Sequence, residues 1–233
     1  MTVTALVSGG KDSIYSAYLA DTQGMSVDEL VVLTPSDPDS MMFHTPNLSM
    51  VALQAQAWGK ATRVVPVGGV SEAEEVHAVR AALEGARGPV VTGAIASAFQ
   101  WTRLQSVTYS LGRPLFAPLW GKDPGRVVRE EIRAGLNIRL VHLAAEPLTP
   151  ELLGRRLDLD LVNEIERRSR EIRPVHVAGE GGEYETLVTD LPDWTHRLVL
   201  DHLDTERKGS TARLVVREAH LEPKRQGPRF RQP

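Results

Sequence analysis

The sequence predicts an α/β protein, with a doubly wound parallel sheet and a smaller α+β domain at the carboxyl-terminal end. Short apolar runs that are typical of buried parallel strands alternate with segments of helical periodicity as far as residue 111. A glycine-rich turn joins the first strand directly to the first helix. Beyond residue 112 the alternation loosens, which indicates a second domain of mixed structure.

The first expected strand, Val3–Val7, is followed by a dense polar motif. The motif consists of Ser8, Gly9, Gly10, Lys11, Asp12 and Ser13. Glycine lets the backbone approach a ligand closely, and the first N–H groups of the following helix have no partner within that helix. Such a segment binds anions, with Lys11 as a mobile positive charge and the serine hydroxyls as phosphate ligands. Asp12 directly after the lysine distinguishes the motif from the common nucleoside-triphosphate loop, which has Ser or Thr there.

Further elements continue the alternation after the first helix ends near Gly24. Strands are expected at Glu29–Thr34, Ala61–Val67 and Pro89–Thr92, and helices at Leu48–Trp58 and Ser71–Ala86. We expect Asn47 to cap the helix that follows it, and Ser71 with Glu74 forms a capping box.

Two turns are candidates for ligand contact, because ligands bind beyond the carboxyl ends of the strands in open α/β sheets. His44 lies in the polar loop after the second strand, and a structural and a ligand-binding role are both open for it. Gly93, Ala94 and Ile95 follow the fourth strand. Such a turn suits either a planar ligand or a close-packed junction between strand and helix.

The second half of the chain is predicted from local signals. Pro114–Pro124 is expected to be a loop with an apolar aromatic cluster, and Asp123 followed by Pro124 is a favourable helix start. Arginines and carboxylates alternate between Leu152 and Ile172, which indicates charged helices with a solvated face. Strands are expected at Asn137–Leu143, Thr195–Leu200 and Thr211–Val216, and a basic, proline-rich, disordered tail at residues 222–233.

A second dense motif at residues 179–186 contains three carboxylates separated by glycines. In an extended segment Glu183 and Glu185 share one face, and Tyr184 lies on the other. Like charges this close repel each other unless a cation or a proton lies between them. Together with Glu180, these residues suit Mg²⁺, an ammonium ion, an amine, or a general base with a raised pKa.

The composition excludes several kinds of site and partner. The 233 residues include no cysteine, which excludes disulfides, thiolate metal sites and a cysteine nucleophile. The formal net charge of −3 argues against a nucleic-acid partner. The first apolar run is too short for a signal peptide, and no stretch approaches the roughly 20 apolar residues of a membrane span. We therefore expect a cytoplasmic protein with no membrane partner.

Four parts of the sequence together resemble one family. They are residues 8–13, 42–47, 93–103 with 117–123, and 179–188. The first is similar to the pyrophosphate loop of the N-type ATP pyrophosphatases, and the last, Gly-Glu-Gly-Gly-Glu-Tyr-Glu-Thr-Leu-Val, is the more distinctive. Over residues 1–190 the chain resembles the diphthine–ammonia ligases, or diphthamide synthetases. This implies an adenine nucleotide alpha hydrolase-like, Rossmann-like fold.

The resemblance implies an amide ligase that uses ATP and Mg²⁺. Such an enzyme adenylates the carboxylate of diphthine, a modified histidine of translation elongation factor 2. It then aminates the adenylate with ammonia to give diphthamide, and it releases AMP and pyrophosphate. Because the chain has no cysteine for an internal glutaminase, ammonia would come from solution or from a partner.

The resemblance also implies roles for individual residues. ATP and pyrophosphate would be bound by Ser8, Gly9, Gly10, Lys11, Asp12, Ser13, Gly93, Ala94 and Ile95. Diphthine and ammonium would be bound by His44, Glu180, Glu183, Tyr184, Glu185 and Thr186. The catalytic residues would be Lys11, Asp12, Glu183 and Glu185, with Asp12 also holding Mg²⁺. The family pattern is acidic at the position of Ala98, and this departure leaves the substrate contacts near it open.

The expected domains are an ATP-binding domain at residues 1–112, a substrate domain at 113–221 and the tail at 222–233, with the active site between the domains. Three alternatives are kept: the same chemistry on a small-molecule carboxylate in cofactor salvage, a tRNA-modifying ATP pyrophosphatase, and a non-catalytic nucleotide-binding module. A Lys11–Asp12 pair beside a glutamate cluster argues against the last. The oligomeric state, a homodimer included, is left open.

Overall fold

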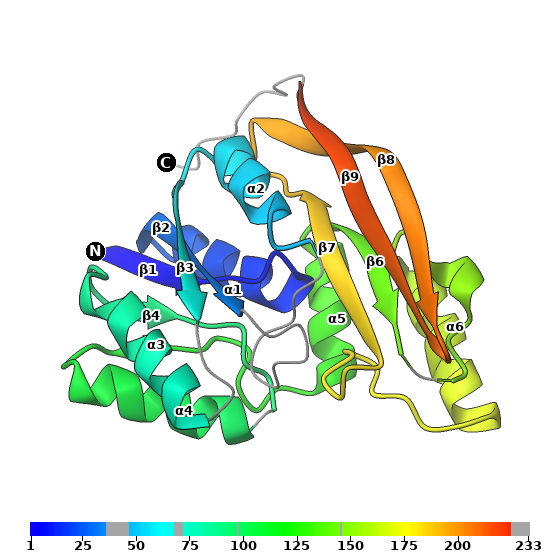
Figure 1. The fold of residues 1–233 in the computed structure, drawn as a ribbon, viewed down its shortest axis with the longest axis horizontal. Coiled ribbons are helices and arrows are strands. Elements are labelled where there is room, and N and C mark those ends of the chain that lie inside the picture. Colours follow the sequence, from blue (N-terminus) through cyan, green and yellow to red (C-terminus); the bar gives the residue numbers. More distant parts are fainter. Residues whose placement is uncertain (36–46, 68–71, 97, 145, 225–233) are drawn as a thin grey trace.

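The structure is a computed structural model that describes residues 1–35, 47–67, 72–96, 98–144 and 146–224. Figure 1 shows a parallel sheet from the amino-terminal half of the chain beside an antiparallel sheet from the carboxyl-terminal half. The predicted α/β class, with a second domain of mixed structure, is therefore confirmed. Within the described ranges, no helix is long and apolar enough to cross a membrane.

The first sheet has the strand order β3-β2-β1-β4-β5, and every pairing in it is parallel. Its strands are β1 (Thr2–Leu6), β2 (Ser26–Pro35), β3 (Ala61–Val67), β4 (Val90–Val91) and β5 (Leu115–Phe116). The chain moves outward from β1 to β3 and then returns to the other side of β1 with β4. A switch point therefore lies between β1 and β4, where open α/β sheets bind ligands.

Helices cover both faces of this sheet, as a doubly wound fold requires. The helices are α1 (Lys11–Thr22), α2 (Met50–Trp58), α3 (Glu72–Glu84) and α4 (Ala98–Ser110). Leu30 of β2 packs in one core with Ile14 of α1. The next residue, Val31, packs in a separate core with Leu83 of α3 and Leu104 of α4. Successive side chains of a strand point to opposite faces, so these two cores lie on opposite sides of the sheet.

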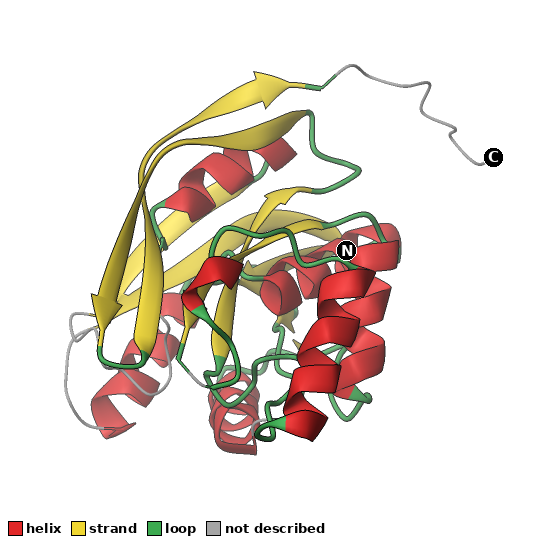
Figure 2. Cartoon of the chain, turned by 90° about the vertical axis from the view of Figure 1, so that its right-hand side faces the viewer, coloured by secondary structure: helices red, strands yellow, loops and turns green. Residues whose placement is uncertain are grey.

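The second sheet is antiparallel and has the order β7-β6-β9-β8. Its strands are β6 (Asn137–Leu143), β7 (Tyr184–Asp190), β8 (His196–Lys208) and β9 (Thr211–Pro223). The chain between β5 and β7 also forms α5 (Pro124–Arg133), a 3₁₀ helix η1 (Pro150–Leu152) and α6 (Leu159–Glu171). Figure 2 shows the two long strands of the β8–β9 hairpin running side by side and curving along one flank of the molecule.

Two predicted features of the second half are confirmed. Asp123 caps α5, since its Oδ1 accepts a 2.7 Å hydrogen bond from the backbone N–H of Arg126, and Pro124 is the first helical residue. Arg167 and Glu171 form an ion pair on the exposed surface of α6, as the solvated charged face requires. Favourable capping chemistry and alternating charge are local signals, so sequence alone could identify them.

The end of the first sheet and the end of β9 differ from the prediction. β5 pairs with β4 inside the expected loop, so the first sheet continues to Phe116, beyond the boundary expected at residue 112. A two-residue strand is too short to show periodicity. β9 includes residues 222 and 223, because they pair with the start of β8. The prediction that they belong to a disordered tail is therefore wrong. Residues 225–233 lie outside the described residues.

Asn47 does not cap α2, because Ser49 occupies that position. Asn47 has a φ of 60°, and its side chain is bonded to β9 instead. Its Nδ2 donates to the carbonyl of Leu214 at 3.0 Å, and its Oδ1 accepts from the N–H of Val216 at 3.0 Å. This residue therefore ties the start of α2 to the second sheet.

Candidate active site

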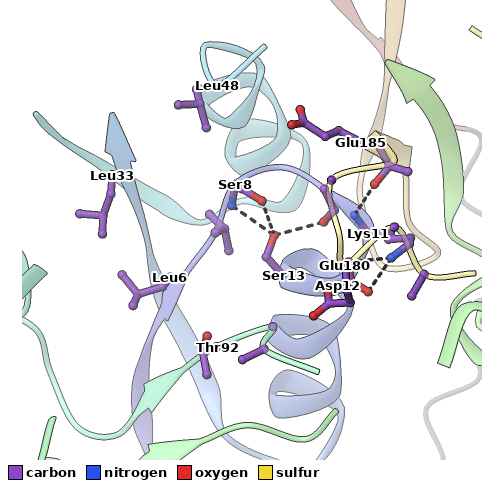
Figure 3. A pocket seen from close by; sticks show the side chains of 18 of the residues that line it. Leu6, Ser8, Lys11, Asp12, Ser13, Leu33, Leu48, Thr92, Glu180 and Glu185 are labelled. Atoms are coloured by element: carbon purple, nitrogen blue, oxygen red, sulfur yellow. Dashed lines mark hydrogen bonds and ion pairs between the residues drawn. The ribbon is translucent and has the colours of Figure 1, made fainter. Parts of the chain in front are cut away.

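A cavity of about 480 Å³ lies where the carboxyl ends of β1 and β2 and the turn after β4 meet β7 and the loop before it. Figure 3 shows Leu6 and Leu33 on one side of the cavity, and Glu180 and Glu185 on the other. The loop at residues 8–13, called the 8–13 loop below, lies between these two sides. The cavity therefore combines an apolar wall, a polar loop at the start of α1 and an acidic wall.

The hydroxyl of Ser13 organises the 8–13 loop. Its Oγ accepts a 3.2 Å hydrogen bond from the N–H of Ser8, lies 3.3 Å from the Ser8 hydroxyl, and donates to the carbonyl of Gly10 at 3.1 Å. Gly10 is the N-cap of α1 and offers no side chain to cap the helix. The first N–H groups of a helix have no partner within it, and its dipole favours an anion by about 0.3–1 kcal/mol. The loop is therefore suited to bind phosphate oxygens.

Lys11 lines the cavity although only 1% of its side chain is exposed. Its Nζ lies 2.7 Å from both carboxylate oxygens of Asp12 and 6.0 Å from the centre of the Tyr184 ring. Burial alone would lower the pKa of Lys11, but Asp12, Glu131 and Tyr184 together raise it above its ordinary value. Lys11 is thus a fixed cation. The prediction of a mobile charge is wrong, because burial and the ion pair hold the side chain in place.

The turn after β4 packs against the start of α1. A Cβ atom on Gly93 would lie 2.6 Å from the nitrogen of Ser13 and 2.7 Å from the carbonyl carbon of Asp12, so only glycine fits. Ala94 lines the cavity. Ile95 is fully buried in the main core and is not among the described residues of the cavity wall. Of the two readings left open for this turn, the structure shows the close junction between strand and helix.

Strand β7 of the second sheet holds the 8–13 loop in place. The N–H of Val188 donates to the carbonyl of Gly9 at 3.0 Å, and the N–H of Lys11 donates to Oγ1 of Thr186 at 3.1 Å. Gln54 of α2 is fully buried, and its Nε2 donates to the carbonyls of Gly9 at 3.0 Å and Val188 at 2.7 Å. The shape of the loop therefore depends on both sheets. Thr186, a predicted substrate ligand on β7, accepts a hydrogen bond from the loop.

The acidic wall presents Glu180 and Glu185 to the cavity. Glu180 accepts a hydrogen bond from the backbone of Ala96, and its burial and the nearby Asp12 raise its pKa above the ordinary value. Glu185 lies on β7, with its Oε1 3.6 Å from Nδ1 of His142 on β6, its cross-strand partner. Two carboxylates on one wall can hold an ammonium ion or an amine.

Glu183 and Glu185 face different cavities, and the shared face that was predicted for them does not form. The reason is that β7 begins only at Tyr184, so Glu183 belongs to the preceding loop. Its carboxylate accepts hydrogen bonds from the N–H of His176 at 3.0 Å and of Gly181 at 2.9 Å. Tyr184 is buried, and its hydroxyl donates to the carbonyl of Val177. Both residues therefore shape the acidic loop.

Glu131 of α5 is a neighbour of the site that is not among the residues predicted from the sequence. It is fully buried, and among the described residues no donor reaches either of its carboxyl oxygens. Burial first, and then the Asp12 carboxylate, raise the pKa of Glu131 well above its ordinary value, although Lys11 acts in the opposite direction. Like Gln54, it is a polar residue on the buried face of a helix, and that position is the signal by which both could have been found.

His44 lies outside the described residues. Asp12, the predicted Mg²⁺ ligand, has 23% of its side chain exposed, and across the described part of the chain no three His, Cys, Asp or Glu side chains are grouped to hold a metal. Mg²⁺ commonly takes one or two protein carboxylates and completes its shell with substrate phosphates and water, so Asp12 fits that use.

Both halves of the chain match known proteins. Residues 1–114 match the diphthamide synthase N-terminal domain, and residues 123–220 match the diphthamide synthase C-terminal domain. The diphthine–ammonia ligase of Danio rerio is 31% identical over 229 residues, which covers 88% of this chain and 88% of that protein. The diphthine–ammonia ligase of Schizosaccharomyces pombe is 31% identical over 224 residues, which covers 86% of this chain but only 36% of the longer relative.

A solved structure also matches the chain. It is described as a predicted subunit of tRNA methyltransferase from Methanocaldococcus jannaschii, and it has 15% sequence identity and a TM-score of 0.44 over 82% of this chain and 97% of that chain. The two domain matches and the relatives at 31% identity together cover most of the sequence. The chain belongs to the diphthamide synthase family.

Proposed function

We propose that the chain is an ATP-dependent diphthine–ammonia ligase. One observation carries the proposal: the anion-binding 8–13 loop and the acidic wall line the same cavity. The hydrogen bonds from Lys11 to Thr186 and from Val188 to Gly9 join the two parts directly. A phosphate-binding loop alone serves many reactions, whereas an acidic wall beside it adds a place for a cationic or amine substrate. The family membership and the names of the relatives support the same reaction.

In the proposed reaction the carboxylate of diphthine on translation elongation factor 2 attacks the α-phosphorus of ATP, and pyrophosphate leaves. Ammonia, formed when an ammonium ion loses a proton, then attacks the acyl carbon of the adenylate. AMP leaves with the electrons of the acyl–oxygen bond, the added nitrogen releases one proton, and the amide of diphthamide remains. The adenylation is needed because a free carboxylate has no leaving group that ammonia can displace.

On the nucleotide side, the adenine would lie against the apolar wall near Leu6, Leu33 and Ala94. The departing pyrophosphate would be held by the N–H groups of the 8–13 loop and by the fixed charge of Lys11. Mg²⁺, when bound, would lie on Asp12 and the phosphates, where it neutralises phosphate charge. The buried ion pair of Lys11 and Asp12 keeps both groups at the cavity without a side-chain rearrangement.

On the acceptor side, Glu180 and Glu185 would hold the ammonium ion and orient the diphthine side chain. Glu183 and Tyr184 would keep the acidic loop in the shape that presents these two carboxylates. In this proposal ATP binds mainly to residues of the first sheet and its loops, and the acceptor binds to residues of the second sheet and the loop before β7. The partners are then elongation factor 2 as the protein substrate and ammonia from solution or from a second protein.

The test is to measure AMP and pyrophosphate released from ATP in the presence of ammonium, with and without elongation factor 2 that carries diphthine. We expect AMP only with the modified factor, together with a mass change on the factor that matches replacement of a hydroxyl by an amine. AMP formation that ignores the factor but responds to small carboxylates would transfer the same chemistry to a small molecule. ADP in place of AMP would refute the proposal.

A further inference from the structure

We propose that Glu131 is a positioning residue that braces the Lys11–Asp12 pair from α5. The proposal rests on the proposed function, because it gives the pair its role in holding pyrophosphate. Glu131 is not among the described residues that line the cavity, so it would act through its neighbours and not by touching the substrate.

The burial of Glu131 is costly unless a specific role offsets it. The side chain is fully buried, and within the described ranges neither oxygen receives a hydrogen bond from an N–H or hydroxyl donor. Burying a polar group without such a donor is unfavourable, because the group loses its hydrogen bonds to water. The neighbouring positions Val127 and Val128 are apolar and fully buried, so the packing of α5 does not itself call for a carboxyl group here.

The polar surroundings of Glu131 include the Lys11–Asp12 pair, together with Tyr15 and Tyr184. A side-chain hydrogen bond joins its carboxyl group to that of Asp12, and electrostatic interactions link it to the ammonium of Lys11 and, more weakly, to Glu180. The charged form of Lys11 is in turn favoured by Asp12, Glu131 and Tyr184. Helix α5 packs against α1, so Glu131 approaches the pair from the protein interior.

Lys11 and Asp12 are held mainly by each other, so a contact from another element would fix where the pair lies in the cavity. Lys11 and Asp12 are adjacent in sequence at the first turn of α1, and both oxygens of Asp12 point to Nζ of Lys11. A polar group of fixed position on α5 limits the rotamers of Asp12, and thereby the place of the Lys11 charge at the cavity. Removing the polar group while keeping its volume would leave the helix packed but free the pair to shift.

The experiment compares pyrophosphate binding by the full chain and its variants, using inorganic pyrophosphate in isothermal titration calorimetry. Glu131→Met keeps the approximate volume and removes the polar group, and Glu131→Gln keeps both. Glu130→Gln is the matched control, since Glu130 is the neighbouring residue on α5 and pairs on the surface with Lys122 and Arg126. Thermal unfolding verifies that each variant is folded, and Glu131→Ala replaces Glu131→Met if the latter is not.

We expect Glu131→Met to weaken pyrophosphate binding by about tenfold or more, which corresponds to about 1.4 kcal/mol. Glu131→Gln should restore the affinity to within about threefold of the wild type, and Glu130→Gln should match the wild type. A purely structural role would lower the unfolding temperature without changing the dissociation constant of the folded protein.

Unchanged pyrophosphate affinity in Glu131→Met would overturn the proposal, and so would an equal loss in Glu131→Gln. Failure of the proposed function has a different signature. A wild-type protein that binds pyrophosphate but forms no AMP with the diphthine-bearing factor would refute the ligase assignment, while the comparison between the Glu131 variants would still stand.

Discussion

Gly93 lies against the backbone of Ser13 so closely that a Cβ atom on the glycine would come within 2.6 Å of the Ser13 nitrogen. The turn after β4 and the first turn of α1 therefore meet backbone to backbone, across the switch point of the first sheet. This contact sets the position of the helix start that offers its N–H groups to an anion. The cavity thus depends on a junction between elements that are far apart in the sequence.

Gly93→Ala should destabilise the protein and weaken ATP binding. The atoms that a methyl group would meet are backbone atoms of Asp12 and Ser13, which cannot rotate away as a side chain can. Overpacking of this kind costs about 1–3 kcal/mol, which urea unfolding measures directly. Gly85→Ala is the matched control, because a Cβ on Gly85 meets nothing within 4 Å, and it should unfold like the wild type. Equal stability of the two variants would contradict the close contact.

Gln54→Ala should loosen the 8–13 loop. It removes the two buried hydrogen bonds from Nε2 to the carbonyls of Gly9 and Val188, and each buried group left without its partner costs about 1–3 kcal/mol. We expect a lower free energy of unfolding and weaker ATP binding, measured by urea titration and calorimetry. Gln56→Ala, on the exposed face of the same helix, should leave both quantities unchanged. A Gln54 variant that binds ATP normally would show that the loop keeps its shape without α2.

Glu185→Gln should impair the use of ammonium while leaving the fold intact. The carboxylate lines the cavity, and a charge-assisted hydrogen bond contributes about 1.5–3 kcal/mol. We therefore expect the KM for ammonium to rise by about tenfold or more, with an unfolding temperature like that of the wild type. The measurement is the rate of AMP formation over a range of ammonium concentrations. An unchanged KM would remove Glu185 from the acceptor side.

Glu183→Ala should lower stability more than it impairs the use of ammonium. The substitution leaves the N–H groups of His176 and Gly181 without their acceptor, at a cost of about 1–3 kcal/mol for a buried donor and less for an exposed one. The unfolding temperature should fall, which differential scanning calorimetry records. The KM for ammonium should change less than in Glu185→Gln. A large effect on that KM with no loss of stability would instead place Glu183 in contact with substrate.

Glu131→Gln should become more stable relative to the wild type as the pH rises. The pKa of Glu131 is raised in the folded state, so its contribution is fully present below the ordinary pKa and is lost as the pH rises through the folded value. Glutamine does not titrate. The difference in free energy of unfolding between variant and wild type should therefore grow as the pH rises above the ordinary pKa of a glutamate, with a slope of at most about 1.4 kcal/mol per pH unit.

Glu130→Gln provides the control for this pH series. The hydrogen bond from Arg126 lowers the pKa of Glu130, so its contribution is present above the ordinary pKa and is lost only as the pH falls below it. Its stability difference from the wild type should therefore be flat over the range in which Glu131→Gln changes. Urea unfolding at each pH supplies both curves, and a flat curve for Glu131→Gln would contradict the raised pKa.

The fold and much of the candidate site could be predicted from local signals. Apolar runs of strand length, glycine turns and capping residues such as Asp123 are read within a few residues of each other. β5 could not be predicted, because two residues show no periodicity. The expected capping role of Asn47 is wrong, because its side chain bonds to Leu214 and Val216, far away in the chain. Gln54 and Glu131 were missed because their partners belong to other elements of the fold.

Residue type and spacing were enough to predict the parallel sheet, the 8–13 loop at the start of α1, and the carboxylates before and within β7. These features follow from residue type and spacing, because backbone conformation and helix starts depend on neighbouring residues. Only the tertiary structure decided that Lys11 is a fixed, buried cation, and that Glu180 and Glu185 face the cavity while Glu183 does not. The direction of a side chain depends on where its strand begins and on what packs against it, and those contacts come from distant parts of the chain.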